Sequence, residues 1–400
     1  MAIQESERPI IGILIGATML GPFAVDMYLP ALPAMTIALK ATESALQLTV
    51  ASFLLGFALG PLVFGPLSDA IGRRRVLIAC IAIFVAMSVC CAYATSVDEL
   101  IAYRVIQAFG GGSATTMART IVHDIYRGDR AAKLLSTLMM ALSLGLMIAP
   151  LIGGQLLDLF GWRSIFWVLA LIGSLSMVTI ITFLPETLPP ERRQPFLLLA
   201  ALKGYGEILR SNHSMGFMLA GAFAGGAMFA YLAATPFVFI DYFGLSPTFY
   251  GALYALNMVG AIALNWLNMR FVMRFGYQRM LVVASATLLV VGSVLLGVAA
   301  TGFGGLVGMA AAVFAIVGLA HCMGTNGLTG ILELSRERAG AASASFAACR
   351  FTVGIAATVA IGLLSDGTPR PLGYVVMICA LAAFVAVSVT VRNKLSLWLN

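Results

Sequence analysis

Long, nearly uncharged stretches recur along the whole chain, and they constrain its fold more than any other feature. A helix that crosses a bilayer needs about 20 mostly apolar residues. Twelve stretches meet that requirement, and we expect spans at 9–36, 45–69, 76–95, 99–122, 134–157, 162–184, 213–241, 249–272, 279–300, 304–332, 340–364 and 372–391. The chain is 60% hydrophobic and only 10% charged, whereas soluble domains are about one-quarter charged. The sequence therefore predicts an all-α polytopic membrane protein.

A long polar gap divides the twelve spans six and six. It covers residues 185–212 and contains "PETLPPERRQPF". We therefore predict an N-terminal six-helix bundle over 1–184, a linker over 185–212 and a C-terminal six-helix bundle over 213–400. The first apolar stretch follows Glu5, Glu7 and Arg8 and lacks a small-residue cleavage pattern. We expect it to be retained as a span and not removed as a signal peptide.

Basic residues set the orientation of these spans. Cytoplasmic loops carry an excess of lysine and arginine, and with a cytoplasmic N-terminus nearly all of the 24 basic residues fall inside. Only Lys40, Arg163 and Arg370 fall outside, while Arg104 and Arg350 lie within spans. Both termini and the linker are thus predicted to be cytoplasmic. The net charge of +7 follows from this bias and requires no nucleic-acid partner.

Residues for cofactor or metal chemistry are scattered. All six cysteines lie in apolar spans without a CxxC pair, and the three histidines, His123, His213 and His321, lack ligand spacing. We find no phosphate-binding GxxxxGK[ST] loop, so ATP is excluded as the direct energy source. A polytopic membrane enzyme would need catalytic groups clustered at one membrane face, and a sensor would need a soluble signalling domain. The sequence favours neither, and we predict no cofactor and no metal.

The stretch "GPLSDAIGRRR" follows the second span. A signal for membrane orientation alone would explain the arginines at its end. It would not explain the acid and the two glycines that precede them at fixed spacing. We expect the first glycine to permit close helix approach and the second to turn the chain sharply. We expect the acid to pair with the N-terminal end or basic flank of a neighbouring helix. The stretch resembles the loop 2–3 signature of the major facilitator superfamily, and the matching residues are Gly65, Asp69, Gly72, Arg73 and Arg74.

Two further stretches resemble motifs of the same superfamily. In the fourth span, "RVIQAFGGG" resembles its R-x-x-Q-G-x-G-A pattern. In the fifth, "GLMIAPLIGG" resembles its antiporter signature through Gly145, Pro150, Gly153 and Gly154. A face of small residues is also typical of ordinary helix packing, and that interpretation stays open for the fifth span.

Three other stretches narrow the resemblance to the Bcr/CflA group of drug–proton antiporters: "DMYLPALPAM", "GWRSIFW" and "PETLPPERRQPF". The resemblance implies a monomeric, multi-pass exporter in the bacterial inner membrane. It would work by alternating access, with protons as the coupling ion and a small drug-like, amphiphilic substrate such as a phenicol or bicyclomycin. The alternative is a solute importer or facilitator of the same fold, against which the fifth-span motif argues.

A carboxylate interrupts the first span at Asp26. It lies roughly 24 Å along a helix that enters near Ile10, at about 1.5 Å per residue, and thus in the outer third of a core about 30 Å thick. Arg104 lies roughly 9 Å into the fourth span from the outer side, at nearly the same depth. We predict that Asp26 and Arg104 are neighbours and carry the proton coupling, with Pro30 and Pro33 bending the helix end. A static buried ion pair, or a surface acid at a short helix end, would explain the same pattern.

Other polar residues within spans are candidates for a substrate cavity. Arg350 lies near the midplane of the eleventh span, where it would balance an anionic or dipolar substrate group or bond a backbone carbonyl. Tyr28, Tyr231 and Asn257 would supply amphipathic walls, although packing and helix–helix contacts explain such residues equally well. We expect Asp241, near the end of the seventh span, to be a boundary or gate residue.

Overall fold

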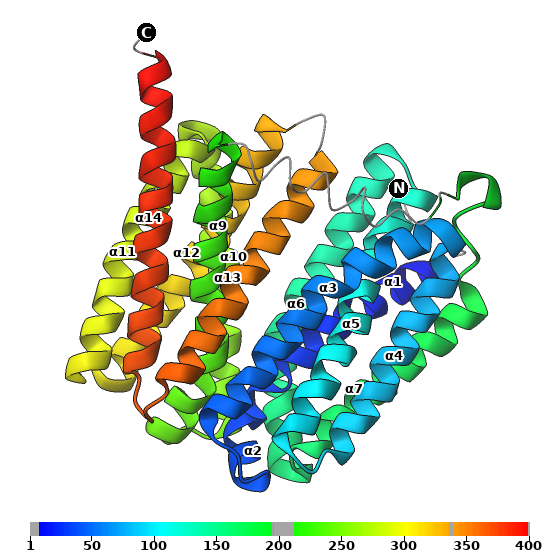
Figure 1. Cartoon of the computed structure of the whole chain (residues 1–400), viewed down its shortest axis with the longest axis horizontal. Helices are drawn as coiled ribbons and strands as arrows, with labels where there is room; N and C mark the ends of the chain where they lie inside the picture. Colours follow the sequence, from blue (N-terminus) through cyan, green and yellow to red (C-terminus); the bar gives the residue numbers. More distant parts are fainter. Residues whose placement is uncertain (1–7, 194, 196–211, 336–338, 399–400) are drawn as a thin grey trace. The chain divides into compact units, whose positions relative to one another are not determined.

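The computed structural model describes residues 8–193, 195, 212–335 and 339–398. Regular structure in these ranges is helical, and twelve transmembrane elements follow one another (Figure 1). They are α1 (Arg8–Asp26) with α2 (Leu32–Ala38), α3 (Glu43–Ile71), α4 (Arg73–Tyr93), α5 (Val97–Ile125), α6 (Gly128–Phe160), α7 (Arg163–Phe183), α9 (Asn212–Pro236), α10 (Pro247–Phe275), α11 (Tyr277–Thr301), α12 (Gly305–Leu334), α13 (Ala339–Leu364) and α14 (Arg370–Trp398). The prediction of an all-α fold is confirmed.

Eleven segments in the described part of the chain are long and apolar enough to cross a membrane. α5 is not one of them, because Arg104, Gln107 and the glycine, serine and threonine residues of 110–116 make its interior less apolar. It is nevertheless 29 residues long and packs against α1 and α4. Large apolar side chains such as Phe303, Met273 and Leu363 are exposed, as expected where lipid is the solvent.

The first predicted span is two helices with a break between them. α1 ends at Asp26, a short 3₁₀ helix, η2, covers Leu29–Ala31, and α2 begins at Leu32. Pro30 and Pro33 both stand in the first turn of these short helices, where a missing N–H costs nothing. The prolines follow the end of α1 at the carboxylate, and the helix is broken there; the bend expected at Pro30 and Pro33 remains a prediction.

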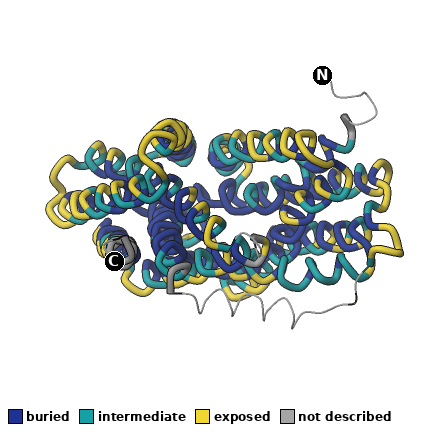
Figure 2. The backbone as a smooth tube through the Cα atoms, turned by 90° about the horizontal axis from the view of Figure 1, so that it is seen from above, coloured by how far each residue is buried: buried dark blue, intermediate teal, exposed yellow. Residues whose placement is uncertain are grey.

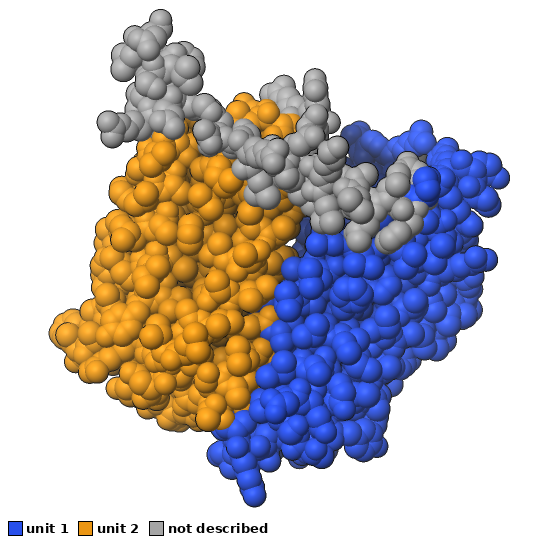
Figure 3. Space-filling view, in the orientation of Figure 1, with its two compact units in different colours: residues 1–41, 52–198, 247–251 blue, residues 42–51, 199–246, 252–400 orange. Residues whose placement is uncertain are grey.

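The chain divides into two compact units, coloured separately in Figure 3. The first unit comprises 1–41, 52–198 and 247–251, and the second comprises 42–51, 199–246 and 252–400. The outer turns of α3 thus belong to the second unit, and the first turn of α10 belongs to the first. The domain boundaries drawn from the sequence remain a prediction, and most of the predicted linker 185–212 lies outside the described residues.

Each unit is built around a buried helix. In the second unit, α9 contacts α12, α13 and α14. In the most apolar 18-residue stretch of this segment 83% of the residues are buried, whereas 28% are buried in the corresponding stretch of α13. In the first, α5 contacts α1 and α4 through a run of buried small residues, Gly110–Ala114. Figure 2 shows these buried stretches in dark blue and exposed residues in yellow. Small residues let helix backbones approach closely, and side chains on neighbouring helices can therefore reach each other inside each unit.

Candidate functional site

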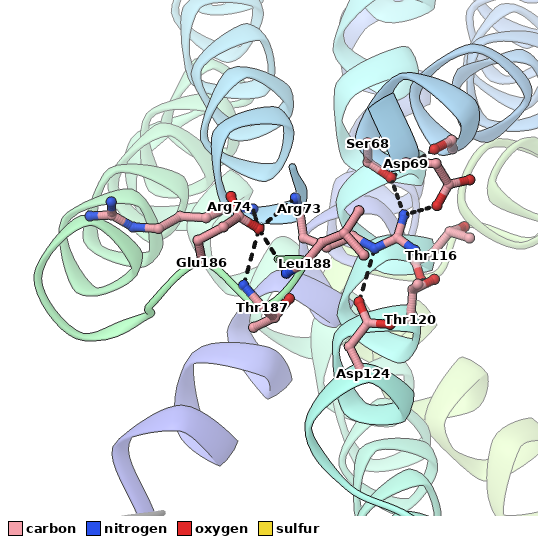
Figure 4. Close-up of polar contacts among 11 residues, drawn as sticks. Ser68, Asp69, Arg73, Arg74, Thr116, Thr120, Asp124, Glu186, Thr187 and Leu188 are labelled. Carbon is pink, nitrogen blue, oxygen red and sulfur yellow. Dashed lines mark hydrogen bonds and ion pairs between the residues drawn. The ribbon is translucent and has the colours of Figure 1, made fainter. Parts of the chain in front are cut away.

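Arg73, the first residue of α4, ties three helices together at the end of the first unit (Figure 4). Its Nη1 lies 2.5 Å from Asp69 Oδ1 and donates to Ser68 Oγ at 2.5 Å, both on α3. Its Nε donates to Asp124 Oδ2 on α5 at 2.9 Å. Asp69 thus has the partner expected from the sequence, the basic flank of the next helix. Its role in transport remains a prediction.

Glu186, which sequence reasoning missed, binds the turn between α3 and α4. Its Oε1 accepts hydrogen bonds from the backbone N of Arg73 at 2.9 Å and of Leu188 at 3.1 Å. Gly72 has φ +111°, and a Cβ there would lie 2.5 Å from Glu186 Oε2. Arg74 Nη2 donates to the carbonyl of Ile181 at 2.6 Å. Gly72 therefore allows the backbone conformation of the turn and also leaves room for the Glu186 carboxylate. An acid directly after the sixth span, predicted on the same side as the arginines, was the available signal.

The expected close helix approach at Gly65 is wrong. No atom lies within 4 Å of the position that its Cβ would take. Gly65 instead lines a cavity of about 150 Å³ with Ser68, Asp69 and Arg73. The motif's first glycine leaves space beside the ion pair and does not bring two backbones together.

Arg104 lies within the first unit with its side chain fully buried, 0% exposed. Its Nη1 donates to the carbonyl of Ala24 and to Gln107 Oε1, each at 2.8 Å. Its guanidinium carbon lies 4.1 Å from the Phe53 ring centroid and 4.5 Å from that of Tyr28. The hydrogen bonds and the aromatic faces, which attract a cation, hold the guanidinium in one position. Tyr28, predicted as a cavity wall, is one of these faces.

Asp26 is the last residue of α1 and is only 3% exposed. The hydrogen bonds of Arg104 go to the Ala24 carbonyl and Gln107, while its Nε and Nη2 are buried without a hydrogen-bond partner. The arginine therefore reaches the backbone of α1 two residues before the acid. The joint coupling role of Asp26 and Arg104 remains a prediction.

The small-residue face of α6 packs on both sides of Asp26. A Cβ at Gly145 would lie 2.7 Å from the Phe23 ring, and a Cβ at Gly153 would overlap the backbone of Met27. Pro150 is buried between these glycines, and Gly154 contacts the backbone of 247–248, which belongs to the same unit. The fifth-span motif thus brings α6 against the end of α1. Its role in antiport remains a prediction.

Arg350 lies on α13 in the second unit, and its side chain lies beside glycines of two neighbouring helices. A Cβ on Gly225 of α9 would lie 2.9 Å from its Nε, and one on Gly324 of α12 would lie 3.6 Å from its Nη1. Its Nε is shielded from solvent and has no hydrogen-bond partner. Among the residues that the structure describes, no carboxylate, carbonyl or aromatic ring pairs with this guanidinium. The backbone carbonyl considered as its alternative partner is therefore not found there.

Tyr231 and Asn257 form a second polar group in the same unit. Asn257 Nδ2 donates to the Tyr231 hydroxyl at 3.2 Å, and the Tyr231 ring stacks on Tyr254 at 5.8 Å. Asn257 is 1% exposed, and its Oδ1 has no hydrogen-bond partner among the described residues. The sequence placed both residues in a cavity without indicating that they bond each other. The free amide oxygen is an acceptor available to a ligand.

The chain belongs to the major facilitator superfamily, because the family model described as "Major Facilitator Superfamily" matches residues 14–358. It is therefore a membrane transporter and not an enzyme. The uncharacterized MFS-type transporter YdgK of Bacillus subtilis is 32% identical over 383 residues, which cover 95% of both proteins. The bicyclomycin resistance protein homolog of Haemophilus influenzae is 29% identical over 376 residues, 94% of both proteins.

A solved structure has the same fold. The crystal structure of the nucleoside transporter NupG aligns with a TM-score of 0.76 over 97% of this chain and 99% of that one. Sequence identity in this alignment is 11%, so the likeness concerns the fold alone. The predicted major facilitator fold is confirmed.

Proposed function

We propose that this chain is a proton-coupled exporter of the Bcr/CflA type in the bacterial inner membrane, which moves small amphiphilic compounds outward by alternating access. The similarity to a bicyclomycin resistance protein homolog over 94% of both chains supports drug export. The residues that resemble the antiporter motif pack around Asp26, a buried acid at a helix break. Proton movement inward would drive compound movement outward.

Arg350 is the observation that carries the proposal for substrate binding. A charge shielded from water is costly unless it is paired, and Arg350 Nε has no partner in the described chain. Gly225 and Gly324 leave its side chain room on α9 and α12. We therefore assign Arg350 to a dipolar or anionic group of the substrate. A phenicol nitro group or the carbonyls of bicyclomycin would meet this requirement.

Asp26 is the proposed proton carrier. Protonation must favour one conformational state and substrate binding the other, and each shifts the equilibrium only by its differential affinity. Asp26 suits this role because it is buried and lies at a break between helices, where local rearrangement disturbs few backbone hydrogen bonds. Arg104, fixed by Gln107 and the Ala24 carbonyl, keeps a positive charge on the neighbouring turn of α1.

The experiment is transport in proteoliposomes that hold a pH dye, with bicyclomycin and chloramphenicol as the first compounds. A proton-coupled exporter accumulates compound on the side from which protons flow down their gradient, and it moves protons when compound is added. A solute importer would move compound and protons in the same direction, and a facilitator would ignore the gradient. A susceptibility panel in a pump-deficient strain that expresses the chain extends the compound list.

A further inference from the structure

A second cavity lies within the second unit, away from Arg350. Its volume is about 260 Å³, and it is enclosed by the first turns of α3, the end of α9 with the following π-helix η4 (Phe237–Tyr242), the end of α13 and the loop before α14. All of its lining residues belong to the second unit. By the orientation predicted from the basic residues, these segments lie on the outer side of the membrane.

The polar lining combines two carboxylates and a glutamine amide with the hydroxyls of Tyr242, Ser365 and Thr368. Glu43 and Asp241 contribute carboxylates. Glu43 Oε2 accepts from the Ser365 hydroxyl at 2.6 Å, which fixes that side chain toward the loop. Gln47 is only 2% exposed, and its Oε1 has no hydrogen-bond partner in the part of the chain that the structure describes. A buried acceptor without a donor is costly to leave unpaired, so the amide oxygen is an independent sign that a donor binds here.

The surrounding charge is negative. Asp366 lies in the loop beside Ser365, and its Oδ1 accepts from the Thr368 hydroxyl at 2.6 Å and from the Thr368 backbone N at 2.9 Å. The hydroxyl of Thr368 lowers the pKa of the Asp366 carboxyl below its ordinary value, because it stabilises the charged form. The carboxylate therefore stays ionised at neutral pH. Arg370 at the start of α14 also acts on Asp366, but the three carboxylates Glu43, Asp241 and Asp366 outnumber it, so the local formal charge favours a cation.

The other residues that line the cavity do not suit a metal ion. Calcium takes six to eight oxygen ligands in proteins, whereas most of the other lining side chains here are apolar, including Phe237, Val238, Ile361 and Leu372. A protonated primary amine presents three N–H donors on one nitrogen, which matches two carboxylates and an amide oxygen. A short alkyl chain on that nitrogen would cover the apolar wall.

We propose that this cavity is a binding site for a short primary alkylammonium, held between Glu43 and Asp241 with one N–H donated to Gln47 Oε1. The alkyl chain packs against Phe237 and Leu372. The site is separate from the transport proposal, because Arg350 and Asp26 do not line it. Its occupant bridges α3, η4 and the loop before α14 and stabilises their contact.

The test is isothermal titration of the purified full-length chain in detergent and amine-free buffer, with n-butylammonium as the probe. Saturable binding is expected for n-butylammonium and none for the neutral isostere n-butanol. Tetramethylammonium, a cation without N–H donors, should bind at least about tenfold more weakly, because hydrogen bonds between charged groups are lost. Equal binding of n-butanol, or no binding of n-butylammonium, would overturn the proposal without any mutation.

Variants locate the site. Glu43→Gln, Asp241→Asn and Gln47→Leu should each weaken n-butylammonium binding about tenfold or more. Asp98→Asn is the matched control, because Asp98 is an exposed carboxylate in the first unit, at the predicted outer end of α5, and should leave binding unchanged. Thermal unfolding of each variant verifies its fold. Unchanged binding in the three lining variants, or tighter binding of Ca²⁺ that displaces the amine, would contradict the assignment.

Discussion

Arg104 in the first unit and Arg350 in the second are both arginines within membrane-spanning helices, yet their surroundings differ completely. Arg104 donates to a carbonyl and an amide and lies against the rings of Phe53 and Tyr28. Arg350 lies over two glycines, and no partner for its guanidinium is found in the described chain. Charged side chains in a membrane are expensive and mark function. The comparison separates an arginine with several partners inside its unit from one to which we assign a substrate group.

The neighbours of each arginine explain the difference. Gln107 is itself fixed, because its Nε2 donates to Ser88 Oγ at 2.7 Å, so the contacts of Arg104 form a network across α1, α4 and α5. Beside Arg350, α9 and α12 present Gly225 and Gly324, and the arginine side chain lies against these two glycines. Arg104 Nε and Nη2 also lack a hydrogen-bond partner among the described residues, so the difference lies in the two bonds and the aromatic rings that hold its guanidinium. No such bonds or rings are found for the Arg350 guanidinium among the described residues.

Replacing Arg104 with Met should have the largest effect, because it removes charge-assisted hydrogen bonds and cation–π contacts. We expect a loss of about 3 kcal/mol or more in the free energy of unfolding, seen as a lower unfolding temperature in detergent and reduced yield. Arg104→Lys should recover only part of it, since lysine lacks the planar fork. If Arg104→Met were as stable as the wild type, Arg104 would have no structural role, and the two arginines would not differ as described.

Asp26→Asn should abolish coupling and leave the fold intact, because asparagine is close in size and mimics the protonated acid. Compound-induced proton movement and pH-driven efflux are expected to disappear in proteoliposomes. Asp26→Glu should keep partial activity with a shifted pH optimum. Full coupled transport by Asp26→Asn would make this acid a structural group like Arg104, and the proton site would have to be sought elsewhere.

Gly225→Ala tests whether the position of the Arg350 guanidinium matters for compound binding. The added methyl would overlap the Arg350 side chain and displace the guanidinium without removing its charge. We expect compound binding to weaken several-fold, with the arginine still present. Gly297→Ala is the matched control, because no atom lies within 4 Å of its Cβ position in the same unit. Equal binding by both variants would show that the position of Arg350 is unimportant.

Gly72→Ala should give the smallest of these effects. Gly72 has φ +111°, which an L residue adopts only under strain, and the new Cβ would press on Glu186. A loss of about 1–2 kcal/mol in the free energy of unfolding is expected. Glu186→Gln tests the carboxylate separately and should cost less. If Gly72→Ala were as damaging as Arg104→Met, the first unit would depend on this turn as much as on its buried network.

Local patterns predicted much of this molecule, and long-range contacts were out of reach. Long apolar stretches predicted the spans, and Pro30 and Pro33 indicated the irregular helix end after Asp26. The bond between Glu186 and Arg73 joins residues 113 positions apart, and the sequence indicated only that both lie on the same predicted side of the membrane. Gly65 was misjudged, because a glycine in a helix suggests close packing equally well whether its neighbour is a backbone or a cavity.

The most direct test of the contrast between the arginines is titration of an exported compound into purified wild type and Arg350→Ala, with thermal unfolding measured on the same samples. We predict that Arg350→Ala lowers compound affinity about tenfold or more, because hydrogen bonds to a charged group are lost, and leaves the unfolding temperature unchanged or raised. Arg350→Lys should fall between the two proteins in affinity. If Arg350→Ala binds compound like the wild type, or if stability and affinity fall together as expected for Arg104→Met, Arg350 is a structural arginine and the substrate site lies elsewhere.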